Sequence, residues 1–214
     1  MRIVLLGCPG AGKGTQAEFI ARDFHLPLIS TGQLLRSEVQ SESKLGREIK
    51  DILNSGRLVD NATVISLITK RLASKDSLEG FLLDGFPRTL EQAKALDEAK
   101  IHIDTVIELA VPDAEIVKRL TGRLVHVPSG RTYHTIFNPP KVAGKDDVTG
   151  EALQQRDDDS EATVLNRLAV YHQQTEPISV FYQNKAGVSY LKVDGTQSVA
   201  DIYAKIQQFL RQLS

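Results

Sequence analysis

The sequence predicts an α/β fold in which helices cover both faces of a doubly wound, five-stranded parallel sheet that carries a P-loop. Three observations support this prediction. Short apolar runs alternate with longer amphipathic segments, and repeated strand–helix units of this kind build a parallel sheet. The first apolar run leads into a glycine-rich turn. One later segment, residues 122–159, breaks the alternation with short pieces separated by turns.

Five apolar runs are expected to form the strands of the sheet. They are RIVLL (2–6), LPLIS (26–30), EGFLLD (79–84), DTVIELAV (104–111) and VSYLKVD (188–194). Helices are expected between the strands. The first should run from about Lys13 to Asp23, and the last should begin after Ser198, a residue type that caps helices. Further helices are expected at 113–124 and 161–174.

Two inserts are predicted to interrupt the core. Residues 122–159 combine short alternating strands with turns, which is typical of a small β-rich insert. Residues 30–59 form a second, helical insert between the second and third strands. The core then consists of residues 1–29, 60–121 and 160–214.

Composition limits the partners that can be expected. The chain has 26 Lys and Arg against 27 Asp and Glu, and this balance does not favour bulk binding of nucleic acid. No apolar run approaches the length of a membrane span, and the first one is shorter than the apolar region of a secretory signal. A single cysteine, Cys8, excludes an internal disulfide framework. We therefore expect a cytoplasmic protein without nucleic-acid or membrane partners.

The stretch GCPGAGKGT (7–15) predicts a phosphate-binding loop. Gly7, Gly12 and Lys13 match the pattern G-x-x-x-x-G-K-[ST], but Gly14 occupies the hydroxyl position and Thr15 supplies the hydroxyl one place late. Inward-pointing backbone N–H groups and the partial positive charge of a helix N-terminus favour phosphate in such a loop. Lys13 adds a full positive charge.

The glycine at position 14 changes what a metal ion can use. Without a hydroxyl there, we expect magnesium to be held mainly by phosphates and water, which suits its reluctance to dehydrate. Asp84 ends the third predicted strand and is the natural carboxylate to orient those waters. Ligands gather beyond the carboxyl ends of parallel strands, where both the loop and Asp84 would lie.

Motifs along the whole chain resemble those of the adenylate kinase family, in its bacterial long-lid form. They are GCPGAGKGT (7–15), ISTGQLLR (29–36), LLDGFPRT (82–89) with Gln92, GRLVHVPSGRTYH (122–134) and KVDGT (192–196). The resemblance implies reversible, magnesium-dependent phosphoryl transfer from ATP to AMP, giving two ADP and maintaining adenine nucleotide balance. It also implies a monomer, with residues 122–159 as a lid and residues 30–59 as an AMP-binding insert.

The resemblance assigns a role in the reaction to a ring of cations and one carboxylate, because phosphoryl transfer depends on positioning and electrostatic stabilisation. These residues are Lys13, Asp84, Arg88, Arg123, Arg156 and Arg167. For ATP, the resemblance implies contacts from Gly10, Ala11, Gly12, Lys13, Gly14, Thr15, Arg119, Arg123, Thr132, Tyr133 and Gln197. The family commonly has lysine at the position of Gln197, so only a backbone contact carries over there.

For AMP, the resemblance implies a pocket of phosphate-binding arginines and base-binding residues. They are Thr31, Arg36, Arg57, Leu58, Val59, Gly85, Phe86, Pro87, Arg88, Gln92, Arg156 and Arg167. Arginine's planar fork suits phosphate oxygens, and a glutamine amide can pair with both the ring nitrogen and the amino group of adenine. The bond before Pro87 is expected to be cis, and the acidic pair Asp158 and Asp159 is expected to make contacts on lid closure.

Several positions depart from the family pattern. Gln33 replaces an aspartate that is thought to orient the water shell of magnesium, so we expect a weakened magnesium dependence. Cys8 stands where alanine is usual. The lid keeps the spacing of a zinc site that some relatives carry, with His126, Ser129, Asp146 and Thr149. Because hydroxyls are poor zinc ligands at neutral pH, we expect a hydrogen-bonded cluster there and no zinc.

Other functions remain open at this stage. A kinase for UMP or CMP, or one that uses GTP as donor, would share most of these motifs, although Thr31 and Gln92 favour AMP. A nucleotide-sensing module could keep the P-loop but would not need the arginines of the lid and the AMP pocket together. A simple nucleotide hydrolase is disfavoured, because no water-positioning residue is evident and the inserts favour closure that excludes water.

Overall fold

The core of the protein is a parallel sheet of five strands, as the sequence predicts. The computed structural model describes residues 1–41 and 43–213; Glu42 of the predicted helical insert and Ser214 of the predicted core lie outside these ranges. The strands stand in the order β2-β3-β1-β4-β7 and every neighbouring pair is parallel. Their bounds are β1 (Arg2–Leu6), β2 (Leu28–Ser30), β3 (Phe81–Asp84), β4 (Thr105–Ala110) and β7 (Ser189–Asp194).

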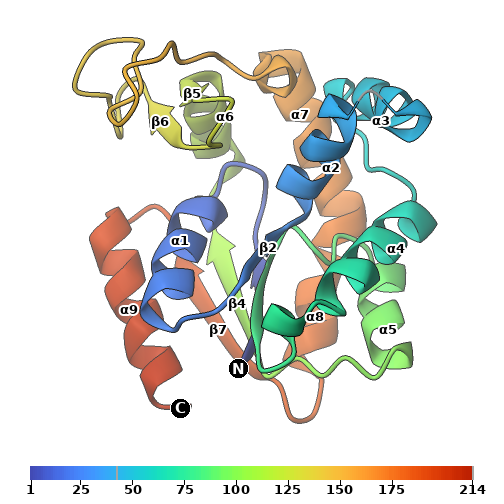
Figure 1. Cartoon of the computed structure of the whole chain (residues 1–214). Helices are drawn as coiled ribbons and strands as arrows, with labels where there is room; N and C mark the ends of the chain where they lie inside the picture. Colours follow the sequence, from blue (N-terminus) through green and yellow to red (C-terminus); the bar gives the residue numbers. More distant parts are fainter. Residues whose placement is uncertain (42, 214) are drawn as a thin grey trace.

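Helices cover both faces of the sheet, because alternate strand residues point to opposite sides. One face packs against α1 (Lys13–Asp23), α6 (Asp113–Thr121), α7 (Glu161–Val170) and α9 (Val199–Arg211). The other packs against α4 (Asn61–Leu72), α5 (Leu90–Glu98) and α8 (Pro177–Gln183). In Figure 1, α1 and α9 lie on the opposite side of the sheet from α4, α5 and α8.

The two predicted inserts contain the expected kinds of structure. Between β2 and α4 the chain forms α2 (Thr31–Gln40) and α3 (Lys44–Asn54). The lid segment contains the short antiparallel pair β5 (Arg123–Val125) and β6 (Thr132–His134) and ends in a 3-10 turn, η2 (Asp157–Asp159). Figure 1 shows the lid beyond the end of the sheet to which the arrow of β4 points.

The helix predicted over 161–174 is correct in position but not in form. The structure ends α7 at Val170 and continues through a π-helical turn, η3 (Tyr171–Thr175), into α8. This turn carries the chain from one face of the sheet to the other, because α7 packs with the first cluster of helices and α8 with the second. A further 3-10 turn, η1 (Lys75–Ser77), precedes β3.

The ends of the first and last helices are close to those expected. The first helix spans the predicted residues, and the Ser198 hydroxyl accepts a hydrogen bond from the backbone N–H of Asp201 at the start of α9. The helix predicted over 113–124 ends three residues earlier, where β5 begins. Within the described ranges, every helix is too short or too polar to cross a membrane.

Candidate functional site

The phosphate-binding loop predicted from the sequence follows the end of β1. Gly7 has a φ of 137°, and a Cβ there would lie 2.6 Å from the carbonyl oxygen of Leu109. Gly12 has a φ of 94° and is the N-cap of α1. Both positions need glycine for conformational or steric reasons. The predicted loop residues therefore stand at the N-terminus of a helix, and they are Gly10, Ala11, Gly12, Lys13, Gly14 and Thr15.

Lys13 folds back over this loop. Its Nζ donates hydrogen bonds to the carbonyl oxygens of Gly7 (2.7 Å) and Cys8 (2.8 Å). Burial lowers the pKa of Lys13 to about 8, although the nearby Asp84 opposes the shift. The amine is therefore still mainly protonated at neutral pH. An anionic oxygen is a stronger partner for an ammonium group than a neutral carbonyl, so this position favours a phosphate.

Asp84 ends β3 directly beside the loop. Its Oδ2 lies 3.9 Å from the position that a Cβ at Gly14 would have, and in the sheet Asp84 pairs with Leu5 of β1. Its carboxylate makes no hydrogen bond or ion pair within the described part of the chain. No group of three or more His, Cys, Asp or Glu residues suited to a metal ion occurs in residues 1–41 and 43–213. Asp84 alone suits an ion that keeps most of its own water, as magnesium does.

A solvent-open cleft of about 790 Å³ begins at the loop and continues between the core and the helical insert. It brings together residues that lie far apart in the sequence. Nine of the predicted site residues line it: Lys13, Arg36, Arg57, Leu58, Gly85, Pro87, Arg88, Arg156 and Arg167. The structure therefore places most of the predicted cations around one space.

Arg36 and Arg88 approach the backbone closely at two glycines. A Cβ at Gly32 would lie 3.1 Å from Nη1 of Arg36, and a Cβ at Gly85 would lie 2.9 Å from Nη2 of Arg88. Burial lowers the pKa of both guanidinium groups, that of Arg36 to about 10. Each stays charged at neutral pH but has lost much of its hydration. Such groups gain most from an anionic ligand that replaces the lost water.

Two aspartates pair with the lid-side arginines. Asp158 accepts hydrogen bonds from Nη2 of Arg156 (2.6 Å) and from Nη1 of Arg167 (2.8 Å). Asp159, which is fully buried, accepts a bidentate pair from Arg123 at 2.8 and 2.6 Å. Burial alone would raise the pKa of Asp158, but Arg167 and Arg156 outweigh it and hold this pKa below its ordinary value.

The backbone of Arg88 is held on both sides. Its N–H donates to Oε1 of Gln92 (2.8 Å), and its carbonyl oxygen accepts from the hydroxyl of Thr175 (2.8 Å). The Phe86–Pro87 peptide bond just before it is cis, in agreement with the expectation from the sequence. The loop from Gly85 to Arg88 is thus fixed by contacts from α5 and from η3.

Four predicted base-pocket residues lie behind the cleft surface. Thr31, Val59, Phe86 and Gln92 are buried and are not part of the cleft lining within the described ranges. The hydroxyl of Thr31 is buried without a hydrogen-bond partner among the described residues. A buried hydroxyl without a partner is costly, so this atom suits a polar ligand group that reaches it.

The residues predicted to contact a second nucleotide lie on the lid side and at the end of β7. Arg119 is on α6, Thr132 is exposed on β6, and Gln197 follows the turn after β7. None of them belongs to the cleft lining in the described ranges. The hydroxyl of Tyr133 donates to Oδ1 of Asp146 (2.9 Å), so its side chain is already engaged within the lid.

Cys8 is a packing residue. Its side chain is 3% exposed and contacts the apolar cluster on the α1 face of the sheet. Its thiol donates weakly to the carbonyl of Val111 at 3.7 Å. Burial raises the pKa of the thiol, and Lys13 only partly offsets this effect. A thiolate is therefore disfavoured.

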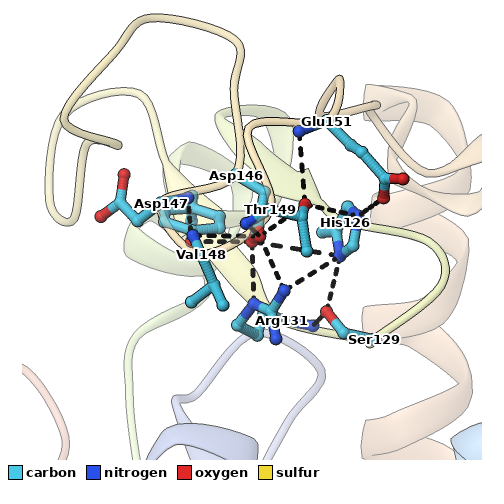
Figure 2. A network of polar contacts seen from close by, with 9 residues as sticks. His126, Ser129, Arg131, Asp146, Asp147, Val148, Thr149 and Glu151 are labelled. Carbon is cyan, nitrogen blue, oxygen red and sulfur yellow. Dashed lines mark hydrogen bonds and ion pairs between the residues drawn. The ribbon is translucent and has the colours of Figure 1, made fainter.

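The four lid positions with zinc-site spacing come together as a polar cluster (Figure 2). Nδ1 of His126 lies 2.7 Å from the hydroxyl of Ser129, and the hydroxyl of Thr149 donates to Asp146 at 2.9 Å. Nε2 of His126 lies 3.3 Å from the Thr149 hydroxyl. Hydrogen bonds thus join the four side chains, as expected from the sequence.

Besides Tyr133, whose hydroxyl donates to Asp146, two further side chains take part in this cluster, and the sequence did not indicate them. Arg131 donates a bidentate pair to Asp146 at 2.8 and 2.6 Å, and Glu151 lies 2.5 Å from Nε2 of His126 (Figure 2). Hydrogen bonds from Arg131 hold the pKa of Asp146 well below its ordinary value. The positions of Arg131 and Glu151 follow no metal-site spacing, so only the folded structure could reveal their part in the cluster.

The π-helical turn supplies cleft residues that the sequence also did not indicate. Tyr171 and Thr175 line the cleft opposite the loop. A π-helical turn has no clear sequence signal, although such turns are frequent at functional sites. Here the hydroxyl of Thr175 reaches the carbonyl oxygen of Arg88, which ties the turn to the cleft.

A comparison with models of protein families matches residues 5–187 to the family described as adenylate kinase. The match covers more than half of the chain. It includes the loop, the cleft, the helical insert and the lid cluster.

Replacing Asp146 by Asn is expected to loosen the lid. An amide would set an NH2 group against donors from Arg131 or Thr149, so amide hydrogen exchange at lid residues such as Tyr133 should become about tenfold faster. Hydrogen exchange followed by mass spectrometry measures this. The matched control is Asp147→Asn, which keeps the oxygen that accepts from the backbone of Lys141 and should leave exchange unchanged.

The pH dependence provides a second test of the same substitution. The pKa of Asp146 is depressed in the folded state. The stabilisation that its carboxylate gives to the folded lid is therefore complete above the ordinary aspartate pKa and is lost as the pH falls through the lower folded value. The difference in lid exchange rate between the wild-type protein and Asp146→Asn should therefore become smaller only under strongly acidic conditions. Equal exchange rates at neutral pH would contradict this view of the cluster.

Proposed function

Because the chain belongs to the adenylate kinase family, it is a kinase that transfers phosphoryl groups between adenine nucleotides, and we propose that it catalyses reversible, magnesium-dependent transfer from ATP to AMP. The products are two ADP, and the reaction maintains the balance of adenine nucleotides. We further propose that the enzyme is of the bacterial long-lid type. Residues 30–59 and 122–159 then act as the AMP-binding insert and the lid, and residues 1–29, 60–121 and 160–214 as the core.

The convergence of cations on one cleft is the observation that carries this proposal. Lys13, Arg36, Arg88, Arg156 and Arg167 line the same space. Burial lowers the pKa of four of them, that of Arg167 to about 10. Two polyphosphate chains that meet in this space would supply the negative charge that these side chains lack. A protein that only sensed a nucleotide would not need cations from both the core and the lid side.

These residues supply positioning and electrostatic stabilisation in the reaction. Lys13 and the loop hold the donor phosphates, while Arg36 and Arg88 hold the acceptor phosphate. Arg123 serves ATP, and Arg156 and Arg167 hold the transferring group, because guanidinium forks match phosphate oxygens. When the inserts close, they exclude water, which limits hydrolysis of ATP.

We assign the AMP base to the pocket behind Arg88. The unpartnered hydroxyl of Thr31 and the carboxamide of Gln92 supply polar groups, and residues 57–59 and 85–88 supply the walls. Adenine offers a ring nitrogen that accepts and an amino group that donates, which a carboxamide can pair at once. ATP is assigned to the loop, with Arg119, Arg123, Thr132, Tyr133 and the backbone of Gln197 on its outer side.

We propose that Asp84 orients the water shell of the magnesium ion that accompanies ATP. The place of its carboxylate beside Gly14 and its freedom from hydrogen bonds in the described ranges support this role. When bound with ATP, magnesium would neutralise part of the phosphate charge.

We also propose that the enzyme is cytoplasmic and monomeric and has no nucleic-acid or membrane partner. The single buried cysteine fits a reducing compartment. The net charge of −1 gives no general attraction to nucleic acid or to anionic membranes.

Measurement of ADP formation tests the proposed reaction. Purified protein is mixed with magnesium and ATP, and then with AMP, CMP, UMP, GMP or no acceptor. Two ADP should form rapidly only when AMP is the acceptor. Of the two purine monophosphates, only AMP matches the hydrogen-bonding groups of the proposed base pocket, and the smaller pyrimidine bases of CMP and UMP do not fill it. Repeating the series with GTP as donor compares the two donors directly.

Each alternative has its own outcome in this experiment. Faster turnover with UMP or CMP would mean that Thr31 and Gln92 do not select AMP. Phosphate release without an acceptor would indicate a hydrolase. Tight nucleotide binding without any transfer would contradict the kinase assignment altogether.

Gln33 predicts a specific magnesium phenotype. The side chain is exposed on α2, and its Nε2 lies 3.5 Å from the position of a Cβ at Gly130, so it contacts the lid turn. An amide cannot supply the charge of the usual aspartate. Gln33→Asp is therefore expected to lower the magnesium concentration for half-maximal activity by roughly threefold, an effect on the order of a weak ion–dipole contact. Gln40→Asp at the far end of α2 is the control, and identical magnesium titrations would contradict the proposal.

The lid is proposed to fold without zinc. Ser129 and Thr149 offer hydroxyls that are poor zinc ligands, and Asp146 is already engaged by Arg131. Elemental analysis of protein purified without chelators should find far less than one zinc per chain. Stoichiometric zinc, removed by a chelator with loss of lid protection from exchange, would overturn this proposal.

A further inference from the structure

A short hydrogen-bond network lies between the start of α4 and the start of α5. Asn61, the first residue of α4, is at its centre. Oδ1 of Asn61 accepts from the hydroxyl of Thr89 (3.0 Å) and from Nε2 of Gln92 (2.9 Å), while its Nδ2 donates to the carboxylate of Glu91 (2.6 Å). Oε1 of Gln92 accepts from the backbone N–H of Arg88 (2.8 Å).

The two groups at the ends of this network fix which atom donates and which accepts in each of its hydrogen bonds. The backbone N–H of Arg88 can only donate, so the Gln92 atom that faces it must be the oxygen. The carboxylate of Glu91 can only accept, so the Asn61 atom that faces it must be the NH2 group. The hydroxyl of Thr89 accepts from the backbone N–H of Gln92 and gives its one proton to Asn61. Both amides are therefore held in one orientation.

The orientation of the Gln92 amide matters because turning it over exchanges the places of its donating NH2 group and its accepting oxygen. Gln92 is 1% exposed, so a reversed amide would leave its NH2 group against the N–H of Arg88 and its oxygen against the oxygen of Asn61. The first contact would set two donors together and the second two acceptors, both in a buried position, which is costly. In the observed orientation, one N–H of Nε2 and one lone pair of Oε1 remain for a ligand.

We propose that Asn61 is a positioning residue that sets the base specificity of the acceptor site by fixing the orientation of Gln92. This proposal rests on the proposed function, in which Gln92 contacts the base of AMP. The free N–H of Gln92 then meets the accepting N1 of adenine, and its oxygen meets the donating amino group. The 6-oxopurines offer the reverse pattern, an accepting oxygen beside a donating N1–H. They could bind only if the amide turned over, and Asn61 opposes this.

Substitution of Asn61 by Leu tests the proposal with inosine monophosphate as the competing acceptor. IMP differs from AMP at the 6-position and at the protonation of N1, so the ratio of kcat/KM for AMP to that for IMP reports the orientation of Gln92. In N61L the ratio should fall about tenfold, which corresponds to the loss of one orienting hydrogen bond. The KM for ATP should not change, because the side chain of Asn61 bonds to Thr89, Glu91 and Gln92 and to no residue of the loop in the described ranges.

Two matched variants separate orientation from general damage. Asn61→Asp combined with Glu91→Gln keeps an acceptor for Gln92 and Thr89, and the amide at position 91 can donate to the carboxylate at position 61, so N61D/E91Q should retain the wild-type ratio within about twofold. Asn184→Leu makes the same change at the C-cap of α8, where the side chain of Asn184 bonds only to the backbone of Val180 in the described ranges, and should also leave the ratio unchanged. If N61L does not fold, Asn61→Ser, whose hydroxyl is too short to reach Gln92, carries the same expectation.

A measurement on the nucleotide-free protein makes the outcome independent of the proposed reaction. The side-chain NH2 signals of Gln92 in an NMR spectrum should report a rigid amide in the wild type and in N61D/E91Q and a mobile one in N61L. If AMP is not a substrate, the proposed function fails while this measurement still decides whether Asn61 holds Gln92. A folded N61L with a rigid Gln92 and an unchanged AMP to IMP ratio would overturn the inference.

Discussion

The rest of the structure depends on the repulsion among positive charges that share one cleft. Lys13, Arg36, Arg88, Arg156 and Arg167 come from the start of α1, the helical insert, the segment after β3, the lid segment and α7, respectively. Like charges in a partly dehydrated space repel one another, and burial lowers the pKa values of Lys13, Arg36, Arg88 and Arg167. The structure meets this cost in two ways: Lys13 donates hydrogen bonds to loop carbonyls, and Asp158 pairs with two arginines.

The parallel sheet is what makes such a concentration of charge possible. Its strands end at the same edge, where the loop after β1 and Asp84 at the end of β3 meet. Fully buried residues such as Ile3, Leu82 and Ile107 fix those strand ends against helices on both faces. Arg36 stands on the helical insert and Arg156 on the lid segment, whereas Lys13, Asp84, Arg88 and Arg167 stand on the core. If the two inserts move, as we propose, the loop and Asp84 keep their places on the sheet.

Most of the fold and the charged part of the site could be predicted from the sequence. Apolar runs and the glycine pattern of residues 7–15 are local signals, and they located every strand of the sheet and the start of α1. The arginines could be recognised by their motifs. The π-helical turn, the contact between Thr175 and Arg88, and the participation of Arg131 in the lid cluster could not, because each depends on segments that only the folded chain brings together.

The two ends of the proposed acceptor site differ in how they would recognise a ligand. At the phosphate end, recognition rests on charge, which acts over several ångströms and tolerates small errors of position. The pairing of Asp158 with arginines keeps its pKa low, so the charge pattern of that end persists as pH falls below the ordinary range of a carboxylate. At the base end, recognition rests on the direction of hydrogen bonds, which reverses completely when one amide turns over. That end therefore needs partners that can act only as donors or only as acceptors, and the backbone N–H of Arg88 and the carboxylate of Glu91 are such partners.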